Sequence, residues 1–139
     1  MEYYDIFDLN NLIFRILKDS GIESQISGGL YSRTRPDDSV LEDIVVNTLS
    51  LTTEYTPQQG TVNINIHVPD IKVNINGKTN SKLNAVRLEQ LGKAVCDIIE
   101  NVNMQGFNIS VSAVSLLEES ERQEHFANIR VQIYIFIKH

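Results

Sequence analysis

Residues 61–68 read TVNINIHV, and this stretch sets the architecture of the chain. Apolar side chains at positions 62, 64, 66 and 68 alternate with Asn and His, the period-two pattern of a strand with one face covered. A β-branched run, Ile44–Leu51, precedes this stretch, and Glu54–Gly60 separates the two. We therefore predict two paired strands joined by a hairpin loop, with the second strand ended by Pro69-Asp70.

The same alternation recurs three times further along the chain. It predicts strands over residues 107–113 and 129–137, and a short extended arm or edge strand over Ile71–Ile75. The loop between the last two strands carries Glu118, Glu119, Glu121 and Glu124, and we expect it to be solvated, with room for a helical turn.

Two segments have helical periodicity instead. The first has apolar residues at the i, i+3, i+4, i+7, i+8 spacing and stops at Gly21, which can adopt a left-handed conformation; the residues are Leu9, Leu12, Ile13, Ile16 and Leu17. The second and longer helix is predicted over Ser81–Val102, with Asn80 or Ser81 as its cap. Its buried stripe comprises Leu88, Leu91, Val95, Ile98 and Val102. The spacing of Ser39 and Glu42 matches a capping box and predicts one short helical turn.

These elements predict an α+β fold. We expect one domain over residues 1–139, a two-layer sandwich in which an antiparallel sheet of about four to five strands packs against two helices. The predicted order is α-β-β-(β)-α-β-β.

Composition limits the function. The chain of 139 residues has a formal net charge of −6, which argues against a nucleic-acid binder driven by bulk charge. Its single cysteine, Cys96, excludes an intramolecular disulfide framework and favours synthesis in a reducing cytoplasm. No apolar stretch is long enough for a membrane span, and the acidic start Met1–Asp5 does not resemble a signal peptide, so we expect no membrane partner.

The outward face of the predicted sheet is polar but nearly uncharged. It carries Asn63, Asn65, Asn108, Ser110, Ser112 and Gln132, with Tyr134 and Phe136 on the same side as Arg130. A solvated face usually carries more Lys and Glu, so another subunit covering this face is one interpretation. A solvent-exposed face that is rich in Asn and Ser is the alternative.

The polar residues form no recognised catalytic motif. The chain has no phosphate-binding loop, dinucleotide fingerprint, nucleophile elbow or paired zinc ligands, and we predict no catalytic residue, cofactor or metal. The three histidines are scattered, and Cys96 is predicted to be structural. Arg33 and Arg35 are expected to pair with nearby carboxylates, within the chain or across to another; these are Asp37, Asp38, Glu42 and Asp43.

The chain resembles the tail terminator (tail completion, head-tail joining) proteins of long-tailed bacteriophages and prophages. The resemblance lies in the order of elements and in three stretches: Gly28-Gly29-Leu30-Tyr31 leading to Arg35-Pro36, then residues 42–47, EDIVVN, and residues 60–64, GTVNI. It implies a structural virion protein without catalysis, made in the host cytoplasm and located in the tail or neck. Such proteins assemble as a homo-oligomeric ring, commonly a hexamer, that caps the tail tube and offers the surface on which the head docks.

The implied partners are further copies of the chain, the tail tube protein and a head-completion or connector protein. DNA would pass through the lumen without specific binding, because a negatively charged wall repels phosphates. Candidate interface residues lie in the 33–43 loop, the hairpin tip, the arm and the final strand: Arg33, Arg35, Asp37, Asp38, Tyr55, Gln58, Ile71, Val73, Tyr134 and Phe136. The alternative is another neck component, or a small protein-binding adaptor that uses the exposed sheet face.

Overall fold

The computed structural model describes residues 3–53 and 56–137 as a mixed α+β protein. Its main sheet has five strands in the order β1-β2-β3-β7-β6, and a separate two-stranded sheet is formed by β4 and β5. The bounds are β1 Leu30–Ser32, β2 Asp43–Leu51, β3 Gln58–Pro69, β4 Ile71–Ile75, β5 Lys78–Lys82, β6 Phe107–Glu119 and β7 Glu124–Ile135. The helices are α1 Ile6–Ser20 and α2 Ala85–Glu100, with short 3₁₀ helices η1 Ile22–Gln25 and η2 Ser120–Arg122.

Both helices share one hydrophobic core with the same face of the sheet. Leu9, Ile13 and Leu17 of α1 and Leu91 and Val95 of α2 are fully buried. They pack in a single cluster with the side chains that alternate along β2, β3 and β7, including Ile44, Val46, Val62, Ile64, Ile66, Ile129, Val131 and Ile133. The predicted α+β class is therefore confirmed, with two helices and a five-stranded sheet. The sheet is not wholly antiparallel as predicted, because β1, a strand that the sequence patterns did not predict, pairs parallel with β2.

The first helix ends where its sequence predicts but begins earlier. Asp5 and Asp8 form a reciprocal capping box, and Gly21 ends the helix in the left-handed region at φ 80°. The helix starts three residues before Leu9, because Asp5 satisfies the free N–H of Asp8 there.

The second helix is shorter than predicted. Ser81 and Lys82 belong to β5, and Asn84 is the cap, its side-chain oxygen accepting a hydrogen bond from Arg87 N at 3.3 Å. The helix ends at Glu100, so Val102 lies outside it, and Ile99 rather than Ile98 is fully buried. The arm at Ile71–Ile75 is one strand of a hairpin whose second strand sequence analysis did not predict.

Three of the predicted loop segments differ from the structure. Residues 39–42 form no helical turn: the Ser39 hydroxyl donates to Asp43 at 2.5 Å, and Glu42 pairs with Arg87. β3 starts at Gln58, inside the predicted 54–60 loop. β6 and β7 continue into the predicted acidic loop, where η2 supplies the helical turn, but Glu124 is only 2% exposed rather than solvated.

A β-bulge changes the direction of the side chains in β6. Val111 lies opposite Val131 and Ala113 lies opposite Arg130, so Ser112 is the extra residue. As a result Ala113 faces away from the core, while Val114 and Leu116 lie on the helix side, opposite Ile129 and Ala127. The period-two alternation predicted over residues 107–113 therefore stops at Val111 and does not include Ala113.

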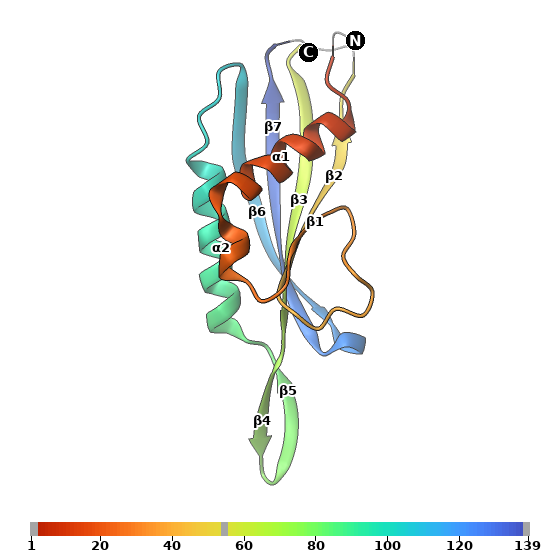
Figure 1. Ribbon diagram of the computed structural model, residues 1–139, viewed down its shortest axis with the longest axis vertical. Helices are drawn as coiled ribbons and strands as arrows, with labels where there is room; N and C mark the ends of the chain where they lie inside the picture. The colour runs from red at the N-terminus through yellow and green to blue at the C-terminus, as the bar shows by residue number, and fades with distance from the viewer. Residues whose placement is uncertain (1–2, 54–55, 138–139) are drawn as a thin grey trace.

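The β4–β5 hairpin extends beyond the end of the main sheet and of both helices (Figure 1). It is therefore exposed on both faces, and both of its strands are made mostly of exposed residues. No helix of the described residues has the length and apolar character needed to cross a membrane.

Candidate functional site

An apolar groove runs between α2 and the second half of β6. It has a volume of about 430 Å³, and its floor is formed by Leu88, Gly92 and Cys96 of the helix and Val114 and Leu116 of the strand. Leu83 and Ala85 lie at one end, and Glu89, Lys93 and Asp97 provide charged groups along the helix side. The bulge at Ser112 creates this groove, because it turns Val114 and Leu116 toward α2.

The groove borders an open edge of the sheet. β6 pairs with β7 on one side and is the last strand in the order of the described sheet. On the edge of β6 that faces away from β7, the Glu100 side chain accepts a hydrogen bond from Val111 N at 3.4 Å and so covers the first part of this edge. Beyond the bulge, Val114 is 58% exposed and Leu116 is 54% exposed. This half of β6 thus presents both apolar side chains and an unpaired strand edge.

Cys96 lies half-buried in this groove. Desolvation raises the pKa of its thiol, and the nearby carboxylates of Glu100 and Asp97 act in the same direction. A thiol that is held protonated is a poor nucleophile, so the environment does not activate it.

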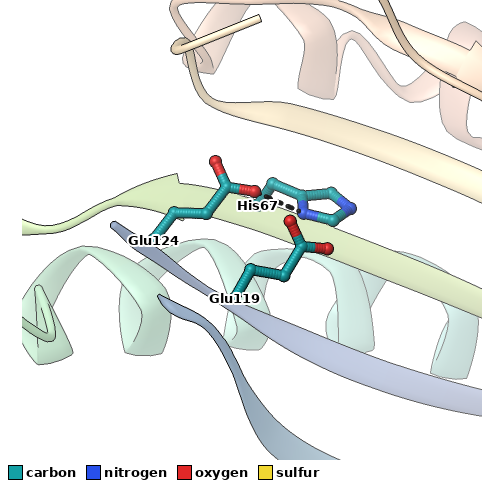
Figure 2. Close-up of side chains that lie close together, drawn as sticks. All are labelled: His67, Glu119 and Glu124. Atoms are coloured by element: carbon teal, nitrogen blue, oxygen red, sulfur yellow. Dashed lines mark hydrogen bonds and ion pairs between the residues drawn. The ribbon is translucent and has the colours of Figure 1, made fainter. Parts of the chain in front are cut away.

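A cluster of charged residues lies on the opposite face of the sheet, where β2, β3 and β7 meet. Figure 2 shows His67, Glu119 and Glu124 directed toward one another, with the ligand atoms of all three within 4.8 Å. His67 Nδ1 lies 3.1 Å from Glu124 Oε1, which places the hydrogen on the histidine, because an ionised carboxylate only accepts. Burial, and then the charge of Arg35, lowers the pKa of His67 to about 4, so the ring is neutral.

Arg35 occupies the centre of this cluster. Its guanidinium contacts Glu124, donates to Asp43 at 3.1 Å and lies 3.6 Å from Glu119, with only 7% of its side chain exposed. A divalent cation bound by His67, Glu119 and Glu124 would have to displace this guanidinium. The arrangement is that of a buried ion-pair network, which fastens the 33–42 loop across the end of the sheet.

Two further arginines, Arg122 and Arg87, hold the 33–42 loop in place. Arg122 Nη2 donates to Ser39 O at 2.6 Å, and Arg87 pairs with Glu42 through Nε at 2.6 Å and Nη2 at 2.9 Å. The acidic group at 37–43 is consequently dispersed: Asp43 and Glu42 bind arginines, whereas Asp37 and Asp38 lie exposed in a turn. Pairing of Arg35 with Asp43 was expected and is confirmed. Arg33 instead lies over the Phe7 ring, 4.8 Å from its centroid.

The remaining predicted interface residues are spread over the molecule. Gln58 is 1% exposed, and its amide bonds Tyr4 and Thr52, so it fastens the N-terminal segment and is not a surface residue. Tyr55 lies outside the described residues. Ile71 is 44% exposed and Val73 is half-buried on the hairpin. Tyr134 is half-buried, and Phe136, at 54% exposure, lies just beyond the end of β7.

The polar sheet face matches its predicted composition only in part, because the charged cluster of His67, Glu119 and Glu124 lies at one end of it and the face is therefore not nearly uncharged. Cross-strand neighbours place Asn63 with Arg130, and Ser110 with Gln132, on this face. Part of its hydrogen-bonding capacity is used internally, since Asn128 donates to Asn65 at 2.7 Å. The buried Asn63 Oδ1 has no hydrogen-bond partner among the described residues.

Sequence analysis did not identify the groove or the contact of Arg35 with Glu124. The sequence feature that could have indicated the groove is the run Val114-Ser115-Leu116-Leu117, whose apolar residues continue past the bulge. The contact with Glu124 has no local signal, because Arg35 and Glu124 are 89 positions apart. No protein-family model matches the chain, and a search of curated proteins finds no match.

Proposed function

We propose that this chain is a structural assembly protein that forms a closed ring of identical subunits, and that the ring serves as a tail terminator of a long-tailed phage or prophage. In that role it would cap the tail tube and offer a docking surface to the head-completion protein. The sequence resemblance supports the phage assignment, and the surface of the folded chain supports assembly.

The observation that carries the proposal is the apolar groove beside the free half of β6. Apolar side chains gathered at an unpaired strand edge favour association with another chain. Val114 and Leu116 line this groove and are 58% and 54% exposed. A subunit in a ring would cover such a surface.

A ring also requires contacts that join unlike surfaces. Head-to-tail contacts use two different patches on each subunit and close into a ring when the rotation allows. A second apolar surface exists on the β4–β5 hairpin, where Ile71 and Ile75 are 44% and 43% exposed. The chain therefore carries the two distinct patches that such an assembly needs.

Light scattering after size exclusion tests the assembly. We expect the wild-type chain to form a discrete ring-sized oligomer whose population rises with concentration, and the double variant V114S/L116S to remain monomeric. Leu49→Ser is the matched control, because Leu49 is 49% exposed on β2 and lies away from the groove. A wild-type monomer at every concentration would contradict a self-assembled ring and favour the adaptor alternative.

Binding to tail tubes tests the specific role. Purified oligomer mixed with tubes of a tail tube protein should appear at tube ends in electron micrographs and stop their elongation. Binding along the tube wall, or to a neck protein only, would favour another neck component.

The net charge of −6 supports a lumen that does not grip DNA. We expect no binding of double-stranded DNA in fluorescence anisotropy at physiological salt. Micromolar binding that weakens with added salt would contradict this part of the proposal.

A further inference from the structure

The β4–β5 hairpin has one apolar face. Ile71, Val73 and Ile75 lie on the same side of β4, and their cross-strand partners on that side are Lys82, Asn80 and Lys78. The face thus consists of an apolar strip flanked by two lysines. Lys72, Asn74, Thr79 and Ser81 form the opposite, wholly polar face.

The chain itself does not cover this strip. The hairpin extends away from the sheet and helices (Figure 1), and both Ile71 and Ile75 remain more than 40% exposed. Its base is held in place, since Asp70 pairs with His125 at 2.6 Å and Lys72 bonds Gln123. The strip therefore cannot fold back onto the groove of its own chain, which begins at Leu83 beside that base.

We propose that the apolar face of the β4–β5 hairpin docks into the α2–β6 groove of a second copy of this chain. The inference rests on the proposed ring, and it names the contact that joins one subunit to the next. Three observations favour this occupant over others.

The first observation is that the hairpin and the groove have similar lengths. The hairpin strands have five residues each and span about 16 Å at the usual rise of a strand. The groove follows α2 from Ala85 to Asp97, about 18 Å along a helix. The two surfaces therefore match in extent.

The second observation is that the hairpin is positively charged and that carboxylates border the groove. Residues 71–82 carry three lysines and no acidic residue in a chain whose net charge is −6. Glu89 and Asp97 border the groove on the helix side, with Lys93 already paired to Glu89 at 2.8 Å. Lys78 and Lys82 lie on the docking face of the hairpin, so they would approach these carboxylates while the apolar strip enters the groove.

The third observation is the shape of the floor. Gly92 leaves a gap in the middle of the groove, because a Cβ built there would meet no atom within 4 Å. Val73, the central residue of the apolar strip, is the side chain that would fill this gap, next to Cys96.

The position of Cys96 provides a direct test. In the variant V73C, mild oxidation with diamide should link the thiol introduced on the hairpin of one copy to Cys96 of the next and give a ladder of covalent oligomers on a non-reducing gel. A disulfide requires Cα atoms within about 7 Å, so the ladder reports close docking. Asn74→Cys is the matched control on the opposite face, and V73C/C96S removes the partner thiol. A ladder that is equally strong in either control overturns the assignment.

Light scattering gives an independent readout. Gly92→Leu fills the groove without touching the core, and I71S/V73S/I75S removes the strip; both should raise the dissociation constant of the oligomer more than tenfold while the circular dichroism spectrum stays that of the wild type. The charge reversal K78E/K82E should weaken assembly about tenfold, and adding E89K/D97K should restore it.

The outcomes separate the two proposals. If the wild-type chain forms a ring and these variants leave it unchanged, the hairpin contact is wrong and the ring stands. If the wild-type chain stays monomeric at every concentration, both are wrong.

Discussion

The guanidinium of Arg35 lies against the carboxylate of Glu124, 89 positions later in the chain, with 7% and 2% of the two side chains exposed. The same guanidinium reaches Asp43 at 3.1 Å. One arginine thus joins the 33–42 loop to the start of β2 and the start of β7, on the face of the sheet opposite the helices.

Arg35→Met should lower the free energy of unfolding by about 3–5 kcal/mol, because it leaves Asp43 and Glu124 buried without their cation. Urea unfolding monitored by circular dichroism measures this loss. Arg33→Met is the control: Arg33 is exposed over the Phe7 ring, and its loss should cost about 1 kcal/mol or less. Equal and small effects of both substitutions would show that the Arg35 network contributes little.

His67 should make the protein less stable in acid. Its pKa is lowered from 6.5 to about 4 in the folded chain, so between these values the unfolded chain binds a proton that the folded chain does not. The free energy of unfolding therefore keeps its full value, as far as His67 is concerned, above pH 6.5 and decreases as the pH falls toward 4. Going from about pH 7 to about pH 4, the wild type should lose about 3 kcal/mol more stability than His67→Gln, which keeps an N–H donor for Glu124. Parallel pH profiles of the two proteins would argue that His67 titrates normally.

Asn10 should be essential for the attachment of α1. It is 1% exposed, and its amide oxygen accepts from Thr48 N at 2.8 Å and Thr48 Oγ1 at 2.9 Å, while its nitrogen donates to Ser32 Oγ at 2.8 Å. Asn10→Ala should cost about 2–3 kcal/mol in urea unfolding, since it removes three hydrogen bonds of a buried amide and leaves the half-buried N–H and hydroxyl of Thr48 without this acceptor. Asn11→Ala, at the exposed neighbouring position, should change stability by less than about 0.5 kcal/mol. A similar small change at position 10 would contradict the assigned bonds.

Two glycines should respond oppositely to alanine. A Cβ at Gly28 would lie 2.0 Å from Asp43 Oδ1 and 2.3 Å from Glu42 O, so the loop must move and Gly28→Ala should destabilise the fold by about 2 kcal/mol or more. Gly92 lies in α2 with open space at its Cβ, and Gly92→Ala should stabilise the fold by about 1 kcal/mol. Thermal unfolding of both variants checks the opposite signs, and a stabilising Gly28→Ala would refute the close approach.

Local periodicity predicted most of the elements. The alternation at 62–68 and the i, i+3, i+4 stripe of α1 need only neighbours in sequence, and a left-handed Gly21 ends α1 as expected. Prediction failed where a local signal competed with partners that the tertiary structure supplies. Ser39 and Glu42 have capping-box spacing, but Asp43 and Arg87 offer them charged partners, which bind more strongly than a capped turn.

Local sequence patterns were sufficient to specify one α+β chain, with a period-two strand at residues 61–68, an apolar stripe on each helix, and a net negative charge. Which surfaces remain open depends on the tertiary structure. The Ser112 bulge reverses the faces of β6, and Arg35 meets Glu124 through the pairing of distant strands. Both depend on register between segments far apart in the chain, and register is set by packing across the whole sheet rather than by any local pattern.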